Sequence, residues 1–203
     1  MTAASGRVRD PERRDKILVV AAELIAARGY HAVTMAEIGQ AAGIVGSGVY
    51  RHFESKAQVL SALLDRTMTE LLDDAARVVD AGHDSATTML LLVRAQVDFS
   101  IDHRDMVGLY RREAPTLPAD EGRRLRRMQR RYNEEWVTTL GELRPELSDA
   151  AAQTLVHAAI GAIQSVVSYD SGLSRPDLVT LLTTAALACL GLRDHAAVDG
   201  PAA

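Results

Sequence analysis

Gly43-Ile-Val-Gly-Ser-Gly-Val-Tyr-Arg-His-Phe-Glu-Ser-Lys56 is the stretch on which the fold of this chain depends. Three glycines within six residues occur both in loops that cradle phosphates and in tight turns between helices. A phosphate-binding loop joins a strand to a helix, whereas the residues before Gly43 have a helical pattern. The glycines also run in the reverse order of the dinucleotide-binding fingerprint, and no lysine stands next to them. The stretch therefore predicts the turn and second helix of a helix-turn-helix unit.

In this interpretation Gly43 ends the first helix of the pair, a position that requires a positive φ. Apolar residues on both sides of the turn would hold the two helices together: Ile38, Ile44, Val49 and Phe53. The outer side of the second helix then enters the major groove of DNA, and its flanks meet phosphates. The side chains available there carry hydroxyl or cationic groups: Tyr50, Arg51, His52 and, at the start of the next helix, Lys56.

Helical periodicity runs along the whole chain, and sustained strand patterns are absent. A first helix is predicted over 10–28. Thr34 and Glu37 form a capping box that opens a short second helix, and another capping box at 55–58 opens a long one. The pattern predicts an all-α protein of about nine helices.

The last two predicted helices, at 148–169 and 176–194, are apolar on almost every side. A helix that is apolar on every side has to be buried on every side. We therefore expect this pair to pack on the core with one face and on a second subunit with the other, which makes the protein a homodimer.

Composition indicates a soluble globular protein, because 47% of the residues are hydrophobic and 25% are charged. The N-terminus carries charges where a secretory signal would be apolar, and no apolar run approaches the length of a membrane span. These features predict a cytoplasmic protein. Residues 1–56 contain eight basic and six acidic residues, whereas the remainder of the chain is acidic, in keeping with two functional regions.

No motif predicts catalysis, a metal site or a cofactor. The chain has one cysteine, Cys189, in an apolar run, which excludes an internal disulfide. The histidines are scattered, and no zinc-binding helix motif or nucleophile elbow is present.

About fifteen positions over residues 14–63 have a fixed spacing: Ile17, Ala21, Ala22, Leu24, Gly29, Tyr30, Thr34, Ile38, Ala41, Gly43, Tyr50, Phe53, Ser55, Lys56 and Leu60. This pattern resembles the N-terminal DNA-binding domain of the tetracycline-repressor (TetR) family. Beyond residue 80 the resemblance is one of architecture and size. It implies a homodimeric transcription factor, usually a repressor, that leaves a roughly palindromic double-stranded DNA operator when a small molecule binds.

The resemblance implies two domains, and the Ala-rich end of the chain, with Gly200 and Pro201, predicts a tail. A three-helix DNA-binding domain is expected at 10–56, with the start of the connecting helix to about 72. A larger helical domain for effector binding and dimerisation is expected at 73–195, and a flexible tail at 196–203.

The predicted DNA-binding residues are Thr34, Gly46, Ser47, Tyr50, Arg51, His52 and Lys56. The chain departs from the family pattern at Val45, where relatives commonly have a capping Ser or Thr. Gly48 within so short a helix costs about 1 kcal/mol relative to Ala. We therefore expect a recognition helix that is only partly ordered until DNA is present.

The predicted effector-binding residues lie in the region where the family keeps its ligand pocket: Phe99, His103, Met106, Tyr110, Met128, Tyr132, Trp136 and Gln164. Core packing is the simpler role for the aromatic and methionine side chains among them. A cavity lined by such side chains suits a small hydrophobic effector, and similarity to actinobacterial-type regulators suggests a fatty acid or an acyl-CoA.

Six arginines at 123–131 leave an alternative open. They form a solvated or salt-bridged face in the favoured interpretation, and a site for acyl-CoA phosphates or DNA in the other. A different class of protein also remains: a helical lipid- or acyl-CoA-binding module, or a small enzyme, with no DNA-binding role.

Overall fold

The computed structural model describes residues 11–44 and 46–192, and every regular element in that part of the chain is a helix. Val45 and the expected tail at 196–203 lie outside the described residues. The elements are α1 (Pro11–Arg28), α2 (Met35–Ala41), the 3₁₀ helix η1 (Gly46–Arg51), α3 (Lys56–Asp80), α4 (Ser85–Asp102), α5 (Arg104–Glu113), η2 (Ala114–Thr116), α6 (Ala119–Leu143), α7 (Asp149–Gln164), η3 (Ser165–Val167) and α8 (Arg175–Cys189). The predicted all-α class is confirmed.

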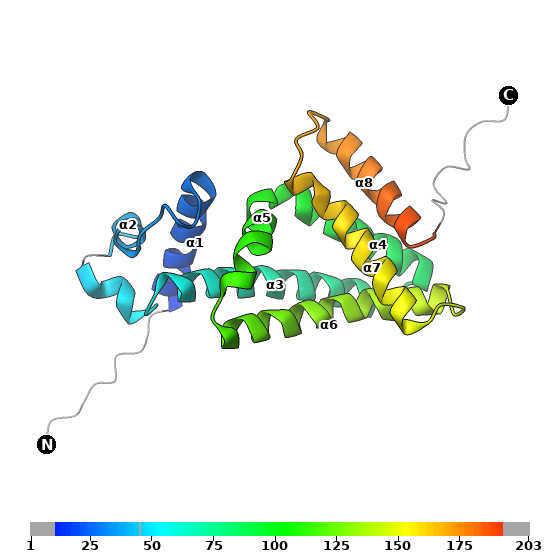
Figure 1. The fold of residues 1–203 in the computed structure, drawn as a ribbon, viewed down its shortest axis with the longest axis horizontal. Coiled ribbons are helices and arrows are strands. Elements are labelled where there is room, and N and C mark those ends of the chain that lie inside the picture. Colours follow the sequence, from blue (N-terminus) through cyan, green and yellow to red (C-terminus); the bar gives the residue numbers. More distant parts are fainter. Residues whose placement is uncertain (1–10, 45, 193–203) are drawn as a thin grey trace, which may run out of the picture.

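The helices form a small N-terminal unit and a larger bundle that share α3 (Figure 1). Helices α1, α2 and η1 gather at the N-terminal end of α3. Helix α6 lies alongside α3, and α4, α7 and α8 pack against one another at the other end of the molecule. Helix α5 stands between the two groups and contacts both α1 and α3.

The turn between α2 and η1 is built as its sequence predicts. The predicted capping box of Thr34 and Glu37 is present at the start of α2. Gly43 has a φ of +71°, and the amide of Ile44 donates to the carbonyl of Gly39 over 2.8 Å. A Cβ on Gly39 would lie 2.8 Å from Cγ2 of Val49, so glycine at this position lets η1 approach α2 closely. Gly48 likewise leaves room for Ile44, which gives this glycine a packing role that the sequence did not indicate.

Helix α7 overturns the expectation that no segment has the length and apolarity of a membrane span. Residues 149–167 reach that length and hydropathy, and 33% of them are buried in this chain. The helix packs on α4, α6 and α8, as a core helix of a bundle does. Its remaining sides are not covered by this chain.

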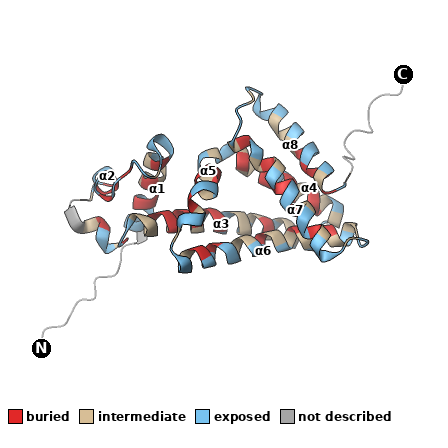
Figure 2. Ribbon diagram, in the orientation of Figure 1, coloured by how far each residue is buried: buried red, intermediate tan, exposed pale blue. Residues whose placement is uncertain are grey.

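The outer faces of α7 and α8 are exposed, as Figure 2 shows for α8 in pale blue. Leu181 on α8 keeps 55% of its surface exposed, and Ala185, Ala158 and Gly161 are exposed as well. A single chain therefore leaves open an apolar, small-residue surface on the two helices that the sequence predicted to be buried on every side.

Candidate DNA-binding surface and candidate ligand cavity

The segment after the turn is a 3₁₀ helix of six residues, Gly46–Arg51, and not an α-helix. Val49 and Phe53 are buried in the core, and the segment packs on α2. Tyr50 is 54% exposed and Arg51 is exposed, so both side chains project from the segment into solvent. A 3₁₀ helix is tighter and has poorer hydrogen bonds than an α-helix. The hydrogen bonds of this element are therefore poorer than those of an α-helix of the same length.

Three further predicted residues lie in η1 or directly after it. His52 is half-buried, and its Nδ1 is buried without a hydrogen-bond partner in the described protein. Gly46 belongs to the 3₁₀ helix, and so does Ser47, whose side chain lies outside what the structure describes.

Thr34 is committed to its own capping box. Its hydroxyl donates to Glu37 Oε2 over 2.7 Å, and its amide donates to the same oxygen over 2.8 Å. The Glu37 amide donates back to the Thr34 hydroxyl over 3.3 Å, and Arg28 forms an ion pair with the carboxylate at 2.8 Å. The Thr34 hydrogen bonds, with Arg28, lower the pKa of Glu37 to about 2. Both donors of Thr34 therefore face a carboxylate, and a phosphate would have to compete with it.

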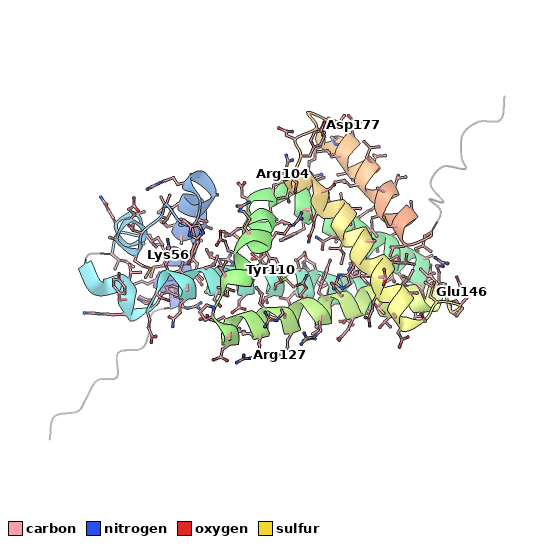
Figure 3. The ribbon with its side chains drawn as sticks, in the orientation of Figure 1. Lys56, Arg104, Tyr110, Arg127, Glu146 and Asp177 are labelled. Atoms are coloured by element: carbon pink, nitrogen blue, oxygen red, sulfur yellow. The ribbon has the colours of Figure 1, made fainter. Side chains whose placement is uncertain are left out.

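The side chain of Lys56 has a different role from the one expected. Its Nζ donates to the carbonyls of Tyr30, His31 and Val33 at 3.0, 3.3 and 2.9 Å, and it lies 4.5 Å from the centre of the Tyr30 ring. An ammonium has three donors, so all of them are used inside the protein. Lys56, labelled in Figure 3, ties the turn after α1 to the start of α3. Only its backbone amide, in the first turn of α3, remains for a phosphate.

A small cavity lies between α3, α4, α5, α6 and α7. Its lining comprises Thr67, Met68, Leu71, Gln96, Phe99, Val107, Tyr110, Gln129, Tyr132, Asn133, Ile160 and Gln164. We call it the inner cavity. The predicted residues Phe99, Tyr110, Tyr132 and Gln164 are thus brought together around one space.

Hydrogen bonds link the polar groups of the inner cavity in one chain and one separate pair. The Tyr132 hydroxyl donates to Gln96 Oε1 over 2.6 Å, and Gln96 Nε2 donates to Ser100 Oγ over 3.0 Å. The Tyr110 hydroxyl donates to Gln129 Oε1 over 2.9 Å. Burial raises the pKa of Tyr110 to about 12 and also raises the pKa of Tyr132. Both phenols are therefore neutral donors near neutral pH.

Four predicted effector residues lie elsewhere. Trp136 is fully buried in the core and Met128 packs against the core, so neither of them lines the inner cavity. His103 stands at the break between α4 and α5, where the chain turns, and lines a separate groove against α1 and α3 together with Met106. Helical spacing alone does not distinguish a side chain that faces the cavity from one a turn away that faces the packed interior.

The sequence also missed part of the lining. Thr67, Met68 and Leu71 come from α3, which the sequence predicts as a connecting helix. Gln129 and Asn133 flank Tyr132 on α6, so their spacing from Tyr132 was the signal that could have identified them. Within the described part of the chain, no group of three or more His, Cys, Asp or Glu side chains is arranged to hold a metal ion.

The sequence matches one family model, described as "Bacterial regulatory proteins, tetR family". The match covers residues 17–63, which contain α2, the turn and η1. The HTH-type transcriptional repressor KstR2 of Rhodococcus jostii (strain RHA1) is 33% identical over 109 residues, 54% of this chain and 53% of the relative. The HTH-type transcriptional activator FasR of Mycolicibacterium smegmatis (strain ATCC 700084 / mc(2)155) is 35% identical over 92 residues, 45% of this chain and 42% of the relative. The chain thus matches about half the length of these curated relatives.

The fold is also that of a solved regulator. The crystal structure of AibR in complex with isovaleryl coenzyme A and operator DNA superimposes with a TM-score of 0.73 at 19% identity, over 85% of this chain and 96% of that one. At this identity the likeness concerns the fold alone.

Proposed function

The chain belongs to the TetR family of bacterial regulatory proteins, and on that premise we propose that it is a ligand-responsive transcriptional repressor of the cytoplasm. It binds a palindromic operator as a homodimer and leaves it when a small hydrophobic effector binds. One observation carries the proposal: Tyr50 and Arg51 project from a short element whose other face is anchored by Val49 and Phe53. An element held in this way is suited to enter the major groove.

Within this function, residues 10–56 are the DNA-binding domain, and the start of α3, to about 72, connects it to the bundle. Tyr50 and Arg51 contact the operator from η1 together with Gly46 and Ser47, and His52 contacts it from the position after η1. The first-turn amides of α2 and α3, which follow Thr34 and include that of Lys56, meet phosphates. The hydroxyl of Thr34 and the ammonium of Lys56 hold these amides in place.

The homodimer forms through α7 and α8, within a domain that extends over 73–195. Its support is the exposed apolar surface at Leu181, Ala185, Ala158 and Gly161. Small residues on a helix allow a partner helix to approach closely, and a symmetric pair of such faces is self-complementary.

The effector occupies the inner cavity, and a fatty acid or an acyl-CoA is the class proposed. The apolar and aromatic lining supports a hydrophobic ligand. AibR, which has the same fold, binds isovaleryl coenzyme A, a ligand of this class. The ligand favours a dimer in which the two recognition elements no longer fit successive major grooves, roughly 35 Å apart. Helix α5 lines the cavity and contacts α1 and α3, so it is the element through which this change reaches the DNA-binding domain.

Selection of genomic DNA fragments by the purified protein, followed by titration of the selected fragment, tests the proposal. Tyr50→Ala should weaken binding at least ten-fold without changing dimerisation. Tyr169→Ala is the matched control, because Tyr169 is a 72% exposed tyrosine next to η3, outside the proposed DNA-binding domain. Wild-type binding should also weaken as salt rises, since phosphate contacts release counterions. Failure to select any DNA, with ligand binding intact, would favour a helical ligand-binding module instead.

A further inference from the structure

A second pocket, which we call the outer pocket, lies directly against the inner cavity. It opens between α5, η2 and α6. Tyr110, Gln129 and Gln164 line both spaces. The hydrogen bond from the Tyr110 hydroxyl to Gln129 Oε1 therefore lies at the boundary between the two spaces. In Figure 3, Tyr110 lies where α5 meets α3 and α6.

The two spaces differ in size and in charge. The inner cavity has a volume of about 40 Å³, whereas the outer pocket has a volume of about 340 Å³. A space of the inner size with some polar groups in its wall holds a few water molecules, at roughly 10–15 Å³ for each. Arg111 and Arg126 line the outer pocket, and none of the described residues that line it is acidic. The outer pocket is therefore a larger, positively charged space next to a small one.

The two arginines are available to a ligand. Arg111 uses Nη1 on the carbonyl of Gln164 over 3.4 Å, and a guanidinium has five N–H donors, so most of them remain. Arg126 lies close enough to Tyr110 for its positive charge to lower the pKa of that phenol, against the larger effect of burial. Gly122 helps to set this position, because a Cβ there would come within 3.2 Å of Arg126 Nη1. Planar guanidinium groups of this kind bind carboxylates and phosphates in pairs of hydrogen bonds.

We propose that the outer pocket binds the anionic head of an amphipathic effector, and that the apolar chain of the effector enters the inner cavity after the Tyr110–Gln129 hydrogen bond opens. Arg111 and Arg126 hold the head. Phe99, Val107 and Ile160 receive the chain. The shared chemistry is an apolar tail with an anionic head, supplied either by a fatty carboxylate or by the phosphates of an acyl-CoA. The inference rests on the effector sensing proposed above and adds the charge and the orientation of the ligand.

In this proposal the Tyr110–Gln129 hydrogen bond separates the two spaces until a ligand displaces it. A neutral phenol that donates to an amide oxygen closes the passage without placing a charge in it, and burial keeps this phenol neutral. A tail that displaces the pair exchanges one hydrogen bond for apolar contact, which is favourable only for a ligand with a sizeable apolar chain. The ligand therefore needs both parts. Its anionic head binds the arginines, and its apolar tail displaces the Tyr110–Gln129 hydrogen bond.

Calorimetric titration of the full-length protein with dodecanoate, dodecanoyl-CoA and dodecanol tests the proposal. These probes share one tail and differ in the head. The single tryptophan, Trp136, is buried one helical turn from Tyr132 and provides a second readout by fluorescence. We expect both anionic probes, or one of them, to bind at least ten-fold more tightly than dodecanol. The tighter of the two identifies the source of the anion.

Two double variants make the test specific. Arg111→Gln with Arg126→Gln should weaken the anionic probe at least ten-fold and leave dodecanol unchanged. Arg112→Gln with Arg127→Gln removes two arginines from the same helices that do not line the outer pocket, and should change neither. Figure 3 shows Arg127 at the outer edge of α6. Tyr110→Phe, which keeps the ring and removes the hydrogen bond, should speed the association of every probe that binds.

The outcomes separate this proposal from the function on which it rests. Equal loss of anion binding in both double variants, or absence of binding by both anionic probes, overturns the anion site. Binding of dodecanoate that depends on Arg111 and Arg126 but leaves operator affinity unchanged keeps the anion site and overturns release by the effector.

Discussion

His31 Nε2 lies 3.3 Å from Glu113 Oε2, and this contact joins the turn after α1 to the last residue of α5. Glu113 is 6% exposed, whereas the His31 side chain is 81% exposed. The same carboxylate raises the pKa of Tyr30, after the larger effect of burial. His31 and Tyr30 also give their carbonyls to Lys56. One buried carboxylate of the bundle therefore faces the residues that position the DNA-binding unit.

Replacing Glu113 by Gln should weaken the link between effector and operator. The buried Oε2 has no hydrogen-bond partner in the described protein that meets normal geometry, so the approach of His31 is its nearest compensation. If α5 transmits the effector signal through this pair, the operator affinities with and without effector should become more similar. The coupling free energy, typically about 1–3 kcal/mol, should fall by a part of that amount. Operator titrations with and without ligand measure it. An unchanged ratio, at unchanged dimerisation, excludes the pair from the coupling.

Lys56→Met should destabilise the N-terminal unit. The variant leaves three carbonyl acceptors without their donor. The bonds to Tyr30 and Val33 are partly buried and the one to His31 is exposed, so the cost of about 1–3 kcal/mol for an unsatisfied buried acceptor is an upper bound for each. We expect a loss of about 2 kcal/mol in the free energy of unfolding, measured by urea denaturation, together with weaker operator binding. Lys16→Met is the control, since Lys16 is an exposed lysine on α1. Weaker DNA binding without any loss of stability would instead indicate a direct phosphate contact by the ammonium.

The capping box at Thr34 predicts a pH dependence with a defined sign. The pKa of Glu37 is lowered from 4.5 to about 2, chiefly by hydrogen bonds from Thr34. A carboxyl whose pKa is lower in the folded state contributes stability that is present above pH 4.5 and is lost as the pH falls towards 2. Thermal unfolding of wild type and Glu37→Gln should therefore differ at pH 6 and converge near pH 2. A constant difference over this range would contradict the assignment.

Gly161→Leu should separate folding from dimerisation. A Cβ at Gly161 meets nothing within 4 Å in this chain, so a larger side chain is tolerated by the single subunit. On the proposed interface of α7 and α8 it would collide with the partner. We expect a folded monomer by light scattering and circular dichroism. Gly141→Leu is the control, because Gly141 on α6 also has open space around its Cβ. A dimer of unchanged affinity would place the interface elsewhere.

Much of the N-terminal unit could be predicted because its signals are local. The capping box of Thr34 and Glu37, the positive φ of Gly43 and the burial of Phe53 all follow from residues a few positions apart. Which of the predicted effector residues share one cavity could not be predicted from local patterns. Tyr110 and Tyr132 line the inner cavity, whereas Trp136 lies in the core. Whether a side chain of α6, such as Tyr132 or Trp136, faces the cavity or the core depends on which helix covers that side of α6. No local sequence pattern contains that information.

By itself, the sequence determined the all-helical class, the helix-turn-helix and the family, because helical periodicity, caps and a glycine turn are encoded within a few consecutive residues. The tertiary structure alone decided the role of Lys56, whose ammonium meets carbonyls 23 to 26 residues away in the chain. It also decided that Gly43, at the start of the opening stretch, leads into a 3₁₀ helix packed on α2. Long-range contacts of this kind depend on how helices pack, and packing is a property of the assembled chain.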